Sequence, residues 1–261
     1  MRLNSPQINI ITKACMKASR SLIRDFGEIE NLQVSVKGPG DFVTTSDKKV
    51  EKTIIDELLK ARPDYSVLSE ENGEINNDKS FKWIIDPIDG TANFLHGIPH
   101  FAISIGLEKD GEIICGIIYD PIKDEMFVAE KGNGSYLNNQ RIRVSSRSKL
   151  KDCIIFTGGP KKESEDSDLA LKEYNNFSTK ILIPIRKLGS AALDMAYVAA
   201  GRCDGFWQRN LNYWDIAAGI ILIKESGGFV TDFNGENKYL KNKTILATNS
   251  KINKEMMEVL K

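Results

Sequence analysis

The sequence predicts a layered protein of the α+β or α/β class, and three features lead to this prediction. The first 29 residues carry a helical hydrophobic pattern, the middle of the chain is dense in strand-like segments, and the second half alternates helices with strands. We find no internal repeat, low-complexity tract or long linker in the 261 residues. Helices and strands therefore mix in both halves, which favours two halves that share one layered body.

The N-terminal half begins with helices and continues with strands. Apolar residues from Ile8 to Ile29 recur at three- and four-residue steps, which predicts an amphipathic helix. After a short strand near Val34 and Val36, a second helix is expected over about 47–60, with Pro63 just beyond its end. Strands are then expected over 65–68, 83–85, 101–107, 112–119, 125–130 and 135–137.

The C-terminal half alternates helices with strands. Strands are expected over 153–156, 229–233 and 244–248, and helices over 168–177, 190–200, 213–225 and 254–260. The seam lies in the polar and basic segment 145–151. We therefore predict an N-terminal half of residues 1–147 and a C-terminal half of residues 148–261.

Composition narrows the possible environments and partners. Lys plus Arg equals Asp plus Glu at 36 each, so the zero formal charge gives no general attraction to nucleic acid or acidic membranes. No apolar run approaches the roughly 20 residues that span a bilayer, and the first residues lack a signal-peptide pattern. The four cysteines form no CxxC pair and are expected to be reduced, mostly buried thiols. These features predict a cytoplasmic protein without membrane association.

The segment WIIDPIDGTANF, residues 83–94, carries the most chemistry. An apolar strand delivers Asp86, Pro87 is expected to stop the ladder because it has no N–H, and Asp89 follows at a turn. Two ionised carboxylates this close repel unless a cation lies between them. Mg²⁺ prefers such oxygen ligands, to which the Ile88 carbonyl could be added. A plain Asp-Pro turn is the alternative interpretation.

Phosphate chemistry is suggested by the residues that follow and by three more acids. Gly90 and Thr91 precede a possible helix start, where free N–H groups attract anions. Glu70 follows a predicted strand, Asp47 stands at a helix start, and Asp215 lies in the first turn of an apolar helix. Each acid alone also fits a structural role, as a solvated turn, an N-cap or a partner of the helix dipole.

Together these segments resemble the inositol monophosphatase family of magnesium-dependent, lithium-sensitive phosphatases, and its bacterial branch in particular. The resemblance extends from DFVTTSD at Asp41 to WDIAAG ending at Gly219. WIIDPIDGTANF matches the family's first signature and WDIAAGIILIKESGG its second, with SEENG placed before them. The resemblance implies a layered αβαβα sandwich of the inositol monophosphatase and fructose-1,6-bisphosphatase type.

The resemblance also implies roles for individual residues. Two or three Mg²⁺ ions are expected, the first bound by Glu70, Asp86 and the Ile88 carbonyl. Asp86 would bridge to a second ion held by Asp89 and Asp215, and Glu70 with water would serve a third. The amides of Gly90 and Thr91 would hold the phosphate. Thr91, paired with Asp47, would orient the attacking water and help to deprotonate it. Substrate-side contacts would fall at Ser190, Ala191 and Gln208, with close helix packing by small residues as the alternative interpretation of Ser190 and Ala191.

Gln208 is the point at which the sequence departs from inositol-specific members, which usually carry a glutamate there. Glutamine can bind a hydroxyl but brings no negative charge. Arg209 beside it is interpreted either as a contact for a second anionic group or as a solvated surface residue. The expected reaction is hydrolysis of a small phosphate monoester, inositol 1-phosphate or a related polyol phosphate, by metal-activated water.

Three alternatives stay open. The protein could act on a nucleotide or sugar (bis)phosphate instead. It could also be a regulatory binding protein for RNA or the transcription machinery that keeps the phosphatase site, using a basic stretch formed by Arg141, Arg143, Arg147, Lys149 and Lys151. A structural metal protein without turnover is disfavoured because Asp47 and Thr91 are both present. A homodimer is expected from the family resemblance.

Overall fold

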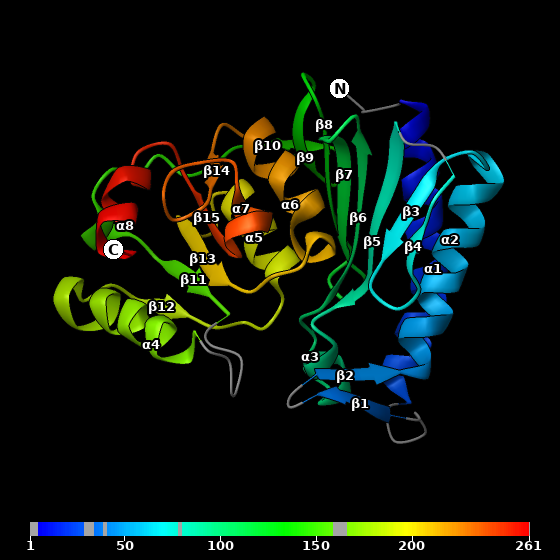
Figure 1. The fold of residues 1–261 in the computed structure, drawn as a ribbon, viewed down its shortest axis with the longest axis horizontal. Coiled ribbons are helices and arrows are strands. Elements are labelled where there is room, and N and C mark those ends of the chain that lie inside the picture. The colour runs from blue at the N-terminus through cyan, green and yellow to red at the C-terminus, as the bar shows by residue number, and fades with distance from the viewer. Residues whose placement is uncertain (1–4, 29–33, 39–40, 78–79, 159–165, 261) are drawn as a thin grey trace.

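The chain folds into alternating layers of helix and sheet. The computed structural model describes residues 5–28, 34–38, 41–77, 80–158 and 166–260. Figure 1 shows the layers in turn, from the blue helices α1 (Pro6–Gly27) and α2 (Thr45–Ala61) to the large sheet, then α5 (Ala191–Ala199) and α6 (Tyr213–Glu225), the small sheet, and finally α4 (Ser167–Asn175) and α8 (Asn253–Leu260). This is the predicted αβαβα order.

The large sheet has eight strands in the order β10-β9-β8-β7-β6-β5-β3-β4. Their bounds are β3 (Ser66–Ser69), β4 (Gly73–Ile75), β5 (Phe81–Asp89), β6 (Ala102–Lys109), β7 (Glu112–Asp120), β8 (Glu125–Glu130), β9 (Gly134–Leu137) and β10 (Gln140–Ile142). Among these strands, only β3 and β5 pair in parallel. The predicted hairpin turns at Asp110 and Gly111, both at positive φ. A separate pair, β1 (Val34–Gly38) and β2 (Asp41–Thr44), precedes α2.

The small sheet has five strands in the order β12-β11-β13-β15-β14. They are β11 (Ile155–Thr157), β12 (Ile185–Arg186), β13 (Gly205–Arg209), β14 (Phe229–Thr231) and β15 (Thr244–Thr248). Strand β13 was not predicted, although it is central and carries Gln208. It starts at a glycine and ends in two polar residues, so it lacks the apolar pattern of a strand. Short helices α3 (Thr91–Leu95) and α7 (Tyr239–Asn242), a 3₁₀ turn (Leu150–Asp152) and a π turn (Asn176–Ile181) complete the described chain.

Burial explains the layering. The predicted stripe of α1 packs on the large sheet, with Ile11, Cys15 and Leu22 fully buried, whereas Ile29 lies outside the described residues. Helix α6 is buried at every position from 216 to 223 because it lies between two sheets. Its approach is close, since a Cβ at Gly116 of β7 would lie 2.9 Å from the Ala218 Cα. The four cysteines are free and buried, as predicted.

One local prediction was wrong. Pro87 does not end its strand, because β5 continues to Asp89. Its pairing with β6 instead shifts register, with Asp86 opposite Ser104 and Asp89 opposite Ala102. Three residue steps on β5 therefore lie opposite two on β6, which defines a β-bulge. The bulge contains Pro87, which has no N–H to donate to the ladder. Along the described ranges, no helix has both the length and the apolar character needed to cross a bilayer.

Candidate active site

Three carboxylates meet where the large sheet faces the start of α6. Among the described residues, Asp86, Asp89 and Asp215 offer oxygens that all lie within 4.8 Å of one another. In a regular strand, residues three apart point to opposite faces. The extra residue of the β5 bulge instead brings Asp86 and Asp89 to the same side, and Asp215 reaches them from the first turn of α6.

Backbone N–H groups hold one oxygen of each carboxylate. The Ile88 N–H donates to Asp86 Oδ1 at 3.0 Å. The Ala192 N–H donates to Asp89 Oδ2 at 2.8 Å, and the Ser190 hydroxyl donates to the same oxygen. The Asn212 N–H donates to Asp215 Oδ2 at 2.7 Å, in a capping box at the start of α6. These bonds orient the carboxylates before any ligand arrives.

The acids carry an electrostatic cost that a divalent cation would relieve. Burial, followed by the charges of Glu70, Asp89 and Asp215, raises the pKa of Asp86 well above its usual range. Burial is also the main cause that raises the pKa of Asp89, to about 6. Hard oxygen ligands in a buried, mutually repelling group suit Mg²⁺. The donor set therefore fits the expected metal.

Glu70 lies at the edge of this cluster. It follows β3 directly, and its N–H donates to the Ile85 carbonyl at 3.3 Å. It is outside the trio of acids within 4.8 Å, yet its charge contributes more than any other neighbouring charge to the raised pKa of Asp86. The Ile88 carbonyl, the other expected metal ligand, accepts the Thr91 hydroxyl at 2.9 Å.

Asp47 and Thr91 come together from distant parts of the chain. The Thr91 hydroxyl lies 3.3 Å from Asp47 Oδ1. The other oxygen of Asp47 accepts the Thr44 N–H at 2.7 Å, as part of a capping box that starts α2. Burial raises the pKa of Asp47 to about 6. Asp47 thus contacts Thr44 in the capping box of α2 and also contacts Thr91.

The loop after the bulge is tied to the C-terminal half. Gly90 has a φ of +97°, and a Cβ there would lie 3.1 Å from the His100 carbonyl and 3.2 Å from the Gly189 carbonyl. The Asn93 amide donates to the carbonyls of His100 at 2.8 Å and Leu188 at 2.7 Å. Only glycine fits at position 90 without strain.

The residues expected on the substrate side occupy different settings. Ser190 is buried, caps α5 through Leu193 and donates to Asp89. Ala191 is buried as the first residue of α5. Gln208 is half-buried, and its amide lies against Gly158, where a Cβ would overlap it.

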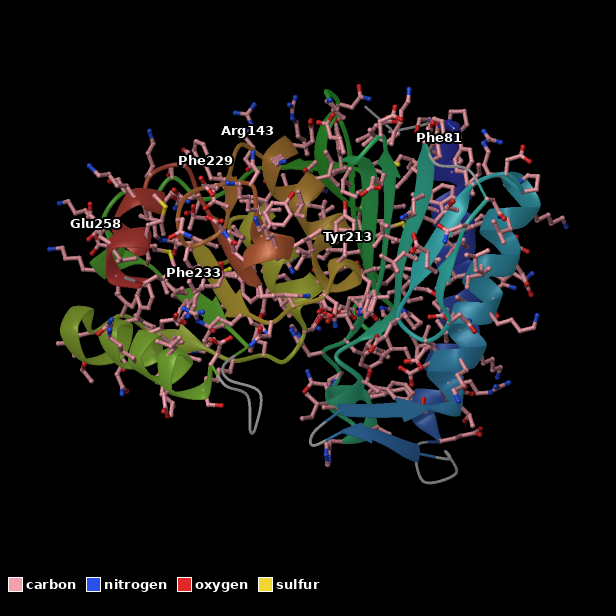
Figure 2. All side chains as sticks on the ribbon, viewed as in Figure 1. Phe81, Arg143, Tyr213, Phe229, Phe233 and Glu258 are labelled. Carbon is pink, nitrogen blue, oxygen red and sulfur yellow. The ribbon has the colours of Figure 1, made fainter. Side chains whose placement is uncertain are left out.

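The interpretation of Arg209 as a solvated surface residue was wrong, whereas its contact with a second anionic group of a substrate stays a prediction. Arg209 contacts Glu173 at 2.5 Å, and its side chain is only 20% exposed. Its guanidinium also lies 5.1 Å from the ring of Phe233, which Figure 2 labels in the half that contains the small sheet. Arg209 therefore joins α4 to the small sheet.

Several supporting residues were missed by sequence reasoning. The Thr44 and Asn212 caps could have been found from their T-x-x-D and N-x-x-D spacing. No local signal links Asn93 to Leu188. Tyr213, labelled at the start of α6 in Figure 2, donates to Glu108 of β6 at 2.6 Å and so holds that helix start on the large sheet.

Known proteins match this chain along almost its whole length. The inositol monophosphatase family matches residues 3–260. An inositol-1-monophosphatase of Mesorhizobium japonicum is 49% identical over 98% of this chain and 97% of its own. The Nus factor SuhB of Escherichia coli strain K12 is 40% identical over 97% of this chain and 94% of its own.

A solved structure agrees with these sequence matches. The crystal structure of the extragenic suppressor protein SuhB from Bartonella henselae superposes with a TM-score of 0.94 at 50% identity, over 98% of this chain and 99% of that one. The fold class expected from the motifs is thereby confirmed. The protein belongs to the inositol monophosphatase family.

Proposed function

We propose that this protein hydrolyses small phosphate monoesters in a Mg²⁺-dependent reaction. The observation that carries the proposal is the trio of buried Asp86, buried Asp89 and half-buried Asp215, with oxygens within 4.8 Å of one another. The trio lies beside a hydroxyl–carboxylate pair, Thr91 and Asp47. Phosphate ester hydrolysis needs both parts, because charge must be neutralised on the phosphoryl oxygens and a water must be oriented in line.

The metal ligands of the proposal are the three acids of the trio together with Glu70 and the Ile88 carbonyl. When bound, the Mg²⁺ ions supply charge neutralisation and lower the pKa of water. The protein's own part is orientation. Backbone N–H groups hold the carboxylates in place, and the bulge at Pro87 keeps two of them on one face of the sheet. Two or three ions remain the expected number.

Thr91 and Asp47 are proposed to act on the attacking water. The single hydroxyl proton of Thr91 can point to Asp47 or to the Ile88 carbonyl. When it points to Asp47, the lone pairs of the Thr91 oxygen can accept a proton of the water. Asp47 is the group that takes up this proton through Thr91. The amides of Gly90 and Thr91, at the start of α3, are proposed to bind the phosphate.

Inositol 1-phosphate or a related polyol phosphate is the proposed substrate. Support comes from relatives called inositol-1-monophosphatases at 46–49% identity. Gln208 is proposed to form hydrogen bonds with substrate hydroxyls, and Ser190 and Ala191 are proposed to contact the substrate beside it. Because glutamine is uncharged, a nucleotide or sugar (bis)phosphate remains the competing substrate class.

Further parts of the proposal concern organisation. We keep the division into residues 1–147 and 148–261, supported by large-sheet strands that all lie before residue 143 and small-sheet strands that all lie after residue 154. We also propose that the protein forms a homodimer, is located in the cytoplasm and is inhibited by Li⁺. Light scattering that gives a monomer mass at micromolar concentration would count against the dimer.

A second candidate function is binding to RNA or the transcription machinery. It is favoured by the relatives named Nus factor SuhB and by the basic stretch, whose five side chains are exposed. Arg147 is partly engaged, since it contacts Asp204 at 3.1 Å. A salt-dependent RNA mobility shift that is lost on charge reversal at Arg141 and Arg143 is the expected result for this function.

The test of the phosphatase proposal is phosphate release from inositol, sugar and nucleoside monophosphates with Mg²⁺, with EDTA and with Li⁺. Asp86→Asn is expected to abolish release. Asp56→Asn, which alters an exposed acid paired with Lys52 on α2, is the matched control and should behave like wild type. If folded, Mg²⁺-loaded wild-type protein releases no phosphate from any of them, the proposal fails.

A further inference from the structure

We infer that Glu51 is a positioning residue for Glu70. The inference rests on the proposed function, in which Glu70 binds metal. Glu51 lies on α2 one helical turn after Asp47, and it is fully buried at 0% exposure. A buried carboxylate is costly unless donors compensate it. Its donors therefore indicate what it does.

Both oxygens of Glu51 bind the connection that carries Glu70. The Glu71 N–H donates to Oε2 at 2.9 Å, and the Asn72 side-chain amide donates to Oε1. Residues 70–72 are the entire link between β3 and β4, which pair directly from Ser69 to Gly73. The carboxylate of Glu51 thus holds the two residues that follow Glu70.

The other side of Glu70 is held by the strand that delivers Asp86. The Glu70 N–H bonds to the carbonyl of Ile85, the residue before Asp86. Glu70 therefore lies between two anchors. One belongs to β5, which carries Asp86, and the other to α2, which carries Asp47. This arrangement fixes Glu70 relative to both parts of the proposed site.

The donors around this position suit a carboxylate. An ionised glutamate only accepts hydrogen bonds, and here both oxygens meet donors. A glutamine would accept the Glu71 N–H through its one oxygen and turn its NH₂ group towards the Asn72 amide, which would have to rotate from its present orientation in order to accept. Exchanging Asn72 for aspartate at the same time would restore a matched pattern, because the NH₂ group of the introduced glutamine could then donate to the new carboxylate. The double variant also keeps the net charge of the wild-type pair, so it tests the matching of donors and acceptors without a change of charge.

The experiment compares four proteins: wild type, Glu51→Gln, Glu51→Gln with Asn72→Asp, and Glu57→Gln. Glu57 is a matched control because it is also a buried glutamate of α2, but it bonds to Lys13 and Lys17 of α1. The readouts are Mn²⁺ affinity by electron paramagnetic resonance, Mg²⁺ affinity by calorimetry and thermal unfolding in EDTA. None of these requires turnover.

We expect Glu51→Gln to weaken metal affinity about tenfold, the lower end of the effect of losing a group that orients a metal ligand. The double variant should recover most of this loss. Glu57→Gln should lower thermal stability and leave metal affinity unchanged. If Glu51→Gln is as stable as Glu57→Gln and binds metal like wild type, the inference is overturned.

Two further outcomes stay interpretable. If Glu51→Gln fails to fold, Asn72→Ala removes one of the two bonds from an exposed side chain, and a two- to fivefold loss of affinity is expected (roughly the lower part of the same range). Unchanged affinity in Asn72→Ala would then overturn the inference. If wild type binds metal but releases no phosphate, the proposed function fails, whereas the metal affinities still decide the role of Glu51.

Discussion

Replacing Asp86 with asparagine should stabilise the metal-free protein while abolishing turnover. The substitution keeps the oxygen that accepts the Ile88 N–H, but it removes one charge from a buried group of like charges. Two ionised carboxylates whose oxygens lie within 4.8 Å of each other repel by at least about 3.5 kcal/mol at an effective dielectric constant of about 20. Partial protonation relieves some of this repulsion, so we expect a gain of about 2–3 kcal/mol in the free energy of unfolding at pH 8 in EDTA.

The sign of the pH dependence follows from the raised pKa values. Burial, more than neighbouring charge, raises the pKa of Asp89 from 3.8 to about 6, and that of Asp86 also rises. Both acids bind protons more tightly in the folded state than in the unfolded state. The stability linked to them is complete below about pH 4 and is lost as pH rises through about 6. The advantage of Asp86→Asn should therefore shrink towards zero near pH 4.

Urea unfolding at pH 4, 6 and 8 measures these differences, with Asp56→Asn as the exposed control. Adding Mg²⁺ at 100 times its dissociation constant should stabilise wild type by about 2.7 kcal/mol and the variant by less. The reasoning is refuted if Asp86→Asn destabilises the EDTA-treated protein at pH 8. It is equally refuted if the gain has the same size at pH 4 and pH 8.

Three further predictions concern the surroundings of the trio. Ser190→Ala should lower the free energy of unfolding in urea by about 1–2 kcal/mol, because a helix cap is lost, and should raise the Mg²⁺ concentration needed for half-maximal activity, because Asp89 loses a donor. Unchanged Mg²⁺ activation would contradict the second part. Activity should rise with pH through about 6 as Asp47 ionises. This rise in the kcat–pH profile should vanish in Asp47→Asn. A rise that persists in the variant would come from another group. Gly116→Ala should lower the free energy of unfolding in urea by about 1–3 kcal/mol through overpacking, because the Ala218 backbone blocks the new methyl group. Mg²⁺ affinity should be unchanged. A variant as stable as wild type would contradict the close packing of α6 on the large sheet.

Much of the fold could be predicted because long helical segments and strands of five or six residues can be recognised from local residue patterns. Helix α6 was expected over 213–225 and is found there, and strands β8 and β15 also have their expected bounds. Strands such as β12 and β10 were missed because two or three residues contain too little periodicity to recognise. Strand β13 was missed because its position in the small sheet, rather than its apolar pattern, makes it a strand.

The candidate site was also predictable only in part. The acids of the trio could be picked out from the sequence, because close carboxylates in an apolar setting need a cation and the two signature segments frame them. Their mutual geometry could not, because it depends on a bulge. Pro87 was expected to end its strand, whereas β6 continues the pairing beyond it and turns Asp86 and Asp89 to one face.

Charge, hydrogen-bonding capacity and helix or strand period are local properties, so the candidate site residues can be identified from the sequence alone. How those residues are held depends on the packing of the whole chain. Ser190 lies 101 residues from Asp89, and Glu51 lies 20 residues from Glu71, yet each pair is joined by a hydrogen bond. Such partners are selected by the packing of layers against one another, which no local pattern in the chain encodes.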